Sequence, residues 1–70
     1  MSDVPYIQLN VFLKLRNLAS TGGEAKQLIR QELVKVNGEV DTRNKKKLIA
    51  GDTVEYNGEK FIVNASEIHQ

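Results

Sequence analysis

Two Asn-Gly dipeptides, at positions 37–38 and 57–58, constrain the fold of this 70-residue chain more than any other feature. Each lies between short stretches in which apolar and polar residues alternate, as in strands with one buried face. A type I′ turn needs positive φ at both central residues, and Asn-Gly adopts it readily. The sequence therefore predicts two β-hairpins in a small antiparallel sheet. The residues expected on its buried face are Val34, Val36, Val40, Val54, Tyr56, Phe61 and Val63, with Lys35 on the opposite face.

A first helix is expected before the sheet. Residues 6–9 alternate and suit a short strand, after which the apolar spacing predicts an amphipathic helix over about 9–18. Asn10 is the expected N-cap, and Asn10, Lys14 and Asn17 share the polar side of the helix. The expected apolar stripe comprises Leu9, Phe12, Leu13 and Leu15, widened by Val11 and Leu18.

A second helix is predicted to begin after Thr21. Thr21 and Glu24 have the spacing of a capping box, in which each side chain accepts a hydrogen bond from a main-chain N–H at the helix start. Gly22 and Gly23 in the first turn leave such N–H groups accessible. Ala25, Leu28 and Ile29 form the expected apolar face. Because only residues 19–20 would separate the two helices, we expect them to pack closely at an angle.

Length and composition predict a single α+β domain over residues 1–70, with residues 64–70 as a loose tail. The chain has no cysteine, which excludes disulfides and thiolate metal sites. Its longest purely apolar run, Val11-Phe12-Leu13, is too short to cross a membrane, and its start does not resemble a signal peptide. We therefore expect a soluble, cytoplasmic protein.

Charge is distributed unevenly along the chain. Residues 14–47 carry nine cations against four anions, a net charge of +5, although the whole chain has a net charge of only +1. Four of the cations, Arg43, Lys45, Lys46 and Lys47, lie within five positions between the two hairpins, where we expect them near the C-terminal end of the second helix. A run of like charges is usually a solvated loop, but this asymmetry indicates a polyanionic partner.

Catalytic and metal sites have little support in the sequence. His69 is the only histidine, and neither a second imidazole nor a thiolate accompanies it. Asp41, Asp52 and Glu55 have no nucleophile or organised general base beside them. We therefore expect a protein that is not an enzyme and needs no cofactor or metal.

The ordered set Glu24-Ala25, Leu28-Ile29, Val34-x-Val36-Asn37-Gly38 and Gly51-Asp52 resembles the RNA-binding domain named after ribosomal small-subunit protein four. This S-four domain is also called the alpha-L RNA-binding motif. The resemblance covers about residues 8–54, and the opening of the second helix is most similar to short stand-alone bacterial members. It implies two packed helices against a small twisted sheet, with structured RNA such as ribosomal RNA as the partner.

The resemblance also implies which residues face RNA. Lys26, Lys35 and residues 43–47 match positions that are commonly basic in the family, and Arg30 shares a helix flank with Lys26. Two departures are Gln8 and Gly22-Gly23, where many members have arginine. A third is Glu32, where most have glycine and a left-handed residue is expected. From the residues themselves, Thr21, Gly22 and Gly23 are candidates for holding a phosphate at the second helix start.

An alternative function is also open at this point. A basic face could dock an acidic protein, or an exposed strand edge could add a partner strand. The RNA interpretation needs Lys26, Lys35 and residues 43–47 to lie side by side. The aromatic residues Tyr6, Phe12, Tyr56 and Phe61 occupy core-like positions, which favours folded RNA over stacked single strands. The sequence indicates neither the particular RNA nor the oligomeric state.

Overall fold

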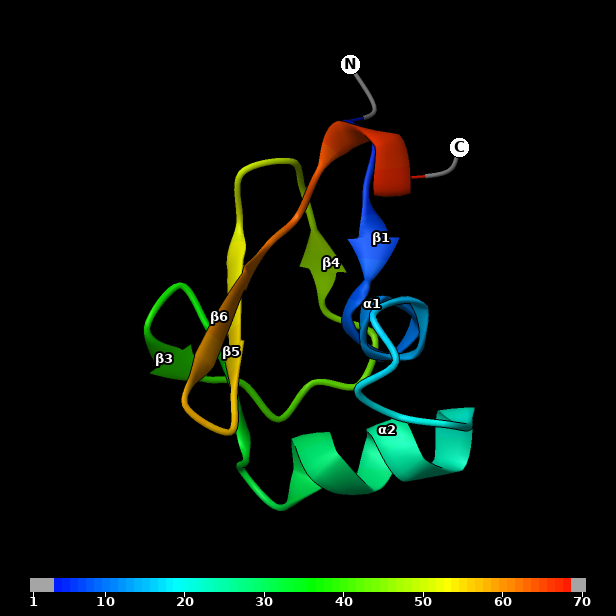
Figure 1. The fold of residues 1–70 in the computed structure, drawn as a ribbon, viewed down its shortest axis with the longest axis vertical. Coiled ribbons are helices and arrows are strands. Elements are labelled where there is room, and N and C mark those ends of the chain that lie inside the picture. Colours follow the sequence, from blue (N-terminus) through cyan, green and yellow to red (C-terminus); the bar gives the residue numbers. More distant parts are fainter. Residues whose placement is uncertain (1–3, 69–70) are drawn as a thin grey trace.

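The computed structural model describes residues 4–68. Strands β3, β2, β5 and β6 form an antiparallel sheet in that order, and β1 pairs with β4 in a separate two-stranded sheet. Figure 1 shows the four-stranded sheet beside α1 and the β1–β4 pair, with α2 running across one end of the molecule. This confirms the expected α+β class. The elements are β1 (Ile7–Gln8), α1 (Leu9–Leu15), α2 (Gly22–Arg30), β2 (Val34–Val36), β3 (Glu39–Val40), β4 (Lys47–Leu48), β5 (Thr53–Tyr56), β6 (Glu59–Ile62) and the 3-10 helix η1 (Ala65–Glu67).

Both Asn-Gly pairs lie in two-residue turns of the four-stranded sheet. Asn37 and Gly38 have φ values of 52° and 87° and connect β2 to β3. Asn57 and Gly58, with φ values of 56° and 81°, connect β5 to β6. All four angles have the positive sign that a type I′ turn requires.

Val40 lies outside the core, with 46% of its surface exposed, so the expectation that it faces inward is wrong. The two residues that flank a two-residue turn pair with each other, here Val36 with Glu39. Val40 then pairs with Lys35 and shares its outward face. The alternation of β2 therefore does not continue unbroken through the turn into β3.

The core lies between the two helices and the inner face of the four-stranded sheet. Burying each of its large side chains contributes roughly 1.5–3 kcal/mol. Leu48 joins this core from β4, a strand that the sequence analysis did not anticipate. The buried members are Ile7, Leu9, Phe12, Leu13, Ala19, Ala25, Ile29, Val34, Val36, Leu48, Val54 and Val63.

Helix α1 ends at Leu15, three residues earlier than predicted. Asn17 adopts a left-handed conformation with φ of 61°. The Leu18 N–H then donates to the Leu13 carbonyl oxygen (2.8 Å), and the Asn17 N–H donates to the Lys14 carbonyl oxygen (3.0 Å). This pattern is a Schellman motif, which satisfies the last carbonyls of a helix. The connection to α2 therefore spans residues 16–21 instead of two residues.

Leu15 is 48% exposed, which corrects its assignment to the apolar stripe. At 100° per residue it lies about 240° around the helix from the buried Leu9. Phe12 and Leu13, which are closer to Leu9 around the helix, are buried as expected.

In the described residues, no helix is long and apolar enough to cross a membrane.

Helix α2 ends in the same way as α1, but with a charged residue at the left-handed position. Glu32 has φ of 63°, as the sequence analysis expected. The Leu33 N–H donates to the Leu28 carbonyl oxygen (3.2 Å), and the Glu32 N–H donates to the Ile29 carbonyl oxygen (3.1 Å). This second Schellman motif reverses the chain between α2 and β2.

The described part of the expected loose tail is ordered by a distant arginine. Arg16 forms an ion pair with Glu67 of η1, and its Nη2 donates to the Ile62 carbonyl oxygen (2.7 Å). The Arg16 guanidinium carbon also lies 5.1 Å from the centroid of the Phe12 ring. Residues 64–68 thus pack against the turn after α1, which differs from the predicted tail.

Candidate nucleic-acid interface

The basic segment, residues 43–47, is anchored to the start of α1 by main-chain hydrogen bonds. The Leu9 N–H donates to the Lys46 carbonyl oxygen (2.8 Å), and the Asn10 N–H donates to the Asn44 carbonyl oxygen (3.1 Å). The first N–H groups of a helix have no partner inside the helix. Carbonyls of the basic segment therefore replace the predicted Asn10 cap, and Gln8 occupies the N-cap position. The segment lies against α1, whereas the sequence analysis had placed it near the C-terminal end of α2.

The lysines of the basic segment have different environments. Lys47 begins β4, where it pairs with Gln8 of β1, so it does not lie in a loop as expected. Its Nζ lies 4.9 Å from the centroid of the Tyr6 ring, close enough for a cation–π contact. Lys45 is exposed and Lys46 is half-buried. Strand pairing and main-chain hydrogen bonds therefore fix the main chain of Lys46 and Lys47, and the Tyr6 ring lies against the Lys47 ammonium group.

Arg43 differs from the lysines because its charge is already paired. Its Nε and Nη2 donate to the two carboxylate oxygens of Asp41, at 3.0 and 2.7 Å. The Arg43 N–H also donates to Asp41 Oδ1 (2.9 Å). Asp41 is buried, and the hydrogen bond from the guanidinium lowers the pKa of its carboxyl group below the usual value. Arg43 is therefore a weaker phosphate candidate than the neighbouring lysines.

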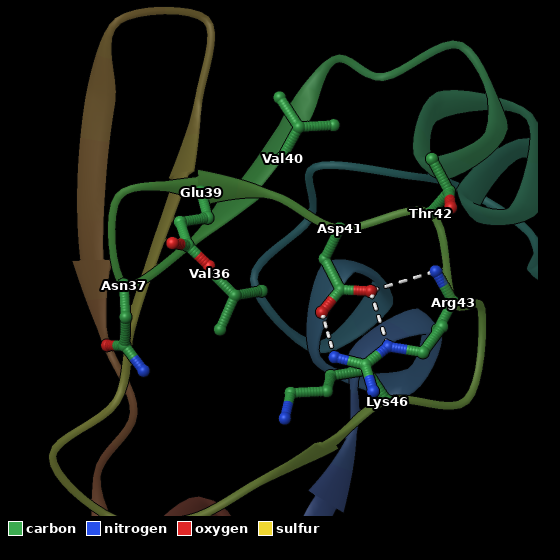
Figure 2. A pocket seen from close by; sticks show the side chains of 8 residues that line it. All are labelled: Val36, Asn37, Glu39, Val40, Asp41, Thr42, Arg43 and Lys46. Atoms are coloured by element: carbon green, nitrogen blue, oxygen red, sulfur yellow. Dashed lines mark hydrogen bonds and ion pairs between the residues drawn. The ribbon is translucent and has the colours of Figure 1, made fainter.

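A pocket of about 380 Å³ lies between the β2–β3 hairpin and residues 41–46. Figure 2 shows the Asp41 carboxylate facing the Arg43 guanidinium, with the Lys46 side chain next to them. The pocket has apolar, acidic and basic walls. Its lining residues are Val36, Asn37, Glu39, Val40, Asp41, Thr42, Arg43 and Lys46.

A second basic area continues along the helices from the anchored segment. Lys14 lies one turn after Asn10 on the same side of α1, and its Nζ is 4.0 Å from the position that a Cβ on Gly22 would occupy. Gly22, Lys26 and Arg30 follow one another at four-residue intervals on α2. The sequence analysis did not select Lys14, although its spacing from Asn10 could have indicated it.

The start of α2 is capped almost as the sequence predicts. Thr21 is the N-cap, and its Oγ1 accepts a hydrogen bond from the Glu24 N–H (3.1 Å). The Glu24 carboxylate accepts from the Ser20 N–H instead of from the N-cap residue itself. Gly22 and Gly23 form the first turn, where a Cβ would meet no atom closer than 3.9 Å. The main chain at this helix start is therefore accessible.

The family model described as the S4 domain matches residues 1–64 of this chain. The chain belongs to the S-four domain family. One relative, 39% identical over 61 residues that make up 87% of each chain, is YbcJ of Escherichia coli (strain K12), which is named as a candidate RNA-binding protein. A second, 43% identical over 56 residues that cover 80% of this chain and 79% of the relative, is "Probable ribosome maturation protein RlbA" of Bacillus subtilis (strain 168).

A solved structure supports the same assignment. The solution structure of E. coli YbcJ, described as revealing an alfaL motif involved in RNA-binding, superposes with a TM-score of 0.67. It is 37% identical, and the match covers 93% of this chain and 82% of that one. The resemblance seen in the sequence is thereby confirmed at the level of family and fold.

The side chain of Lys35 in this S-four domain points in a different direction from those of the candidate residues on α1 and α2. It alternates with the buried Val34 and Val36, so its side chain points to the outer face of the sheet. Its cross-strand neighbours there are Val40 and Glu55, and the carboxylate of Glu55 partly offsets its charge. The three regions expected to lie side by side are therefore on different elements. Lys26 is on α2, Lys35 is on the sheet, and residues 43–47 form a segment anchored to α1.

The aromatic residues of the S-four domain are only partly core residues. Phe12 is fully buried, whereas Tyr6, Tyr56 and Phe61 are half-buried. Arg16 lies over the rings of Phe12 and Phe61. His69 falls outside the described residues. Within residues 4–68, no group of histidine, aspartate and glutamate side chains is arranged to hold a metal ion.

Proposed function

We propose that this S-four domain is a non-enzymatic module, spanning the chain as one domain, that binds structured RNA through a basic ridge. The basic ridge comprises Lys14, Gly22, Gly23, Lys26 and residues 45–47. The observation that carries the proposal is the anchoring of the basic segment to α1, because it brings the main chain of that segment beside the helix that carries Lys14. Arg30 and Thr21 flank this ridge on α2, and Lys35 extends it only if RNA reaches the outer face of the sheet.

The character of the ridge favours folded RNA as the partner. Its groups are ammonium ions and accessible main-chain N–H groups, which contact phosphates without reading base sequence. Double-stranded RNA is recognised mostly by shape and by phosphate and 2′-hydroxyl contacts. The relatives named for RNA binding and ribosome maturation make ribosomal RNA the first candidate. Such a partner would place the protein in the cytoplasm of a bacterial cell.

Co-sedimentation tests the proposal. Purified protein mixed with bacterial ribosomal particles should sediment with them and should be released by nuclease. An acidic protein partner would leave sedimentation insensitive to nuclease, which would contradict RNA binding and favour the alternative.

A pair of variants then tests the ridge itself. Lys14→Ala should weaken RNA binding because Lys14 lies between the basic segment and the start of α2. Lys60→Ala removes the same charge from an exposed position on β6 and serves as the matched control. Equal affinities of the two variants would contradict the ridge, even if RNA binding itself were established.

A further inference from the structure

The pocket between the β2–β3 hairpin and residues 41–46 has the size of a small-ligand site. Its volume of about 380 Å³ falls within the range of roughly 300–1,000 Å³ that such sites occupy. It also borders the basic ridge, because the Lys46 side chain lines the pocket while the Lys46 carbonyl oxygen is bonded to α1. Lys46 is therefore shared by the basic ridge and the pocket.

Arg43 gives this pocket a fixed, flat surface. Asp41 engages one edge of the guanidinium through Nε and Nη2, which sets the orientation of its plane. The Arg43 side chain is nevertheless 70% exposed, so the faces of the plane remain accessible. Guanidinium planes are platforms on which unstacked RNA bases lie.

The charges of the pocket favour a neutral group over a phosphate. Glu39 and Asp41 bring two carboxylates against the cations Arg43 and Lys46, so the walls have no net positive charge. A phosphate would therefore gain no net electrostatic attraction from these walls. A nucleobase is neutral and flat, and its edge carries both donors for Glu39 and acceptors for Lys46. Val40, which is 46% exposed, adds a small apolar area to a mostly polar lining.

We propose that this pocket receives one unstacked base of the bound RNA, which stacks on the guanidinium plane of Arg43. The inference rests on the proposed function and adds a subsite to it. Arg43 thus acts as a stacking surface for a base, while the lysines of the basic ridge contact phosphates. Asp41 is a positioning residue, because it acts only through Arg43.

The test compares two RNA hairpins that differ in one group. The first carries a single bulged adenosine, and the second carries an abasic ribose at the same place, so the phosphates are identical. The protein should bind the first roughly fivefold more tightly, the size expected for one cation–π contact. Arg43→Lys keeps the charge but removes the plane, and it should abolish the difference. Lys60→Ala changes an exposed cation on β6, outside the basic ridge, and should retain it.

The outcomes separate this inference from the proposed function. Binding of both hairpins with equal affinity by the unmodified protein would overturn the base pocket and leave RNA binding intact. Failure to bind either hairpin at low salt would overturn both. Persistence of the difference in Arg43→Lys would also overturn the role of Arg43.

A second measurement avoids any variant, because Arg43→Lys also alters the partner of the buried Asp41. Titration of the isotope-labelled protein with adenosine monophosphate should shift the amide resonances of Val36, Val40, Arg43 and Lys46. Ribose 5-phosphate, which lacks the base, should leave them unchanged. Equal shifts with the two compounds would show that the pocket responds to phosphate and would overturn the inference.

Discussion

The Leu9 N–H at the start of α1 donates to the carbonyl oxygen of Lys46, 2.8 Å away, across 37 positions of the chain. This bond uses only main-chain atoms, so it places the basic segment without depending on the lysine side chains. The charges of the segment can therefore be removed while its position is kept. That separation allows charge and structure to be tested independently.

Replacing Lys45, Lys46 and Lys47 together by alanine should lower RNA affinity broadly across sequences. Each phosphate contact releases condensed counterions, so log affinity falls linearly with log salt concentration. By analogy with DNA, loss of the three contacts should make the slope shallower by roughly two to three units. Binding at several salt concentrations measures the slope, and circular dichroism checks the fold. A folded triple variant with unchanged affinity and slope would indicate that this segment is solvated and does not contact RNA.

Glu32→Gly should stabilise the protein. A non-glycine residue in the left-handed conformation lowers the free energy of unfolding by roughly 1–2 kcal/mol, and glycine removes this cost. Part of the gain is offset because glycine also increases the conformational entropy of the unfolded chain. Asn17→Gly is the matched control, since Asn17 holds the same position at the end of α1 but asparagine tolerates this conformation better. Thermal melts should therefore show a larger increase for Glu32→Gly. An unchanged or lower midpoint would contradict the prediction.

Thr21→Ala should lower the free energy of unfolding by about 1 kcal/mol, because the Glu24 N–H loses its hydrogen-bond acceptor. Ser20→Ala is the control, since Ser20 contributes its main-chain N–H to Glu24 and alanine retains that group. Denaturant unfolding of both variants measures the difference. If α2 also holds a phosphate, folded Thr21→Ala should bind RNA more weakly; intact affinity would count against that phosphate site alone.

Glu67→Gln should destabilise the protein by about 1 kcal/mol near neutral pH through loss of the ion pair with Arg16. Glu59→Gln, an exposed substitution of the same kind on β6, should have a smaller effect. The hydrogen bond from Arg16 lowers the pKa of Glu67 in the folded state. The folded state then binds fewer protons than the unfolded state, so the stabilisation is fully present above the pKa that Glu67 has in the unfolded state.

This stabilisation should disappear as pH falls through the lowered folded-state pKa. Melting temperatures of the unmodified protein and Glu67→Gln should therefore differ near neutral pH and converge once the pH falls below the folded-state pKa of Glu67. Asp41, whose pKa is also lowered, is present in both proteins and cancels in the comparison. A gap that stays constant down to pH 2 would show that packing, and not charge, anchors η1.

Local features of the sequence determined the turns and the helix cap. The Asn-Gly pairs and the Thr21–Glu24 spacing act through residues at most a few positions away, so their conformations can be inferred without knowing the fold, whereas the left-handed Glu32 was expected from the family resemblance. The inward faces of α2 and β2 follow from periodicity in the same way. Val40 was placed wrongly because the alternation was continued unbroken through the turn, and Leu15 because it lies about 240° around α1 from the buried Leu9.

Only the tertiary structure decided which distant residues meet. Strand β1 lies within the alternation at residues 6–9, but β4 contains only two residues, too few to show a period in the sequence, and the two strands pair because the core brings Ile7 and Leu48 together. Arg16 and Glu67 are 51 positions apart. Lys14 approaches Gly22 because a Schellman motif ends α1 early and lets α2 pack beside it. Long-range contacts of this kind depend on the closure of the whole chain, and no short stretch of sequence encodes them.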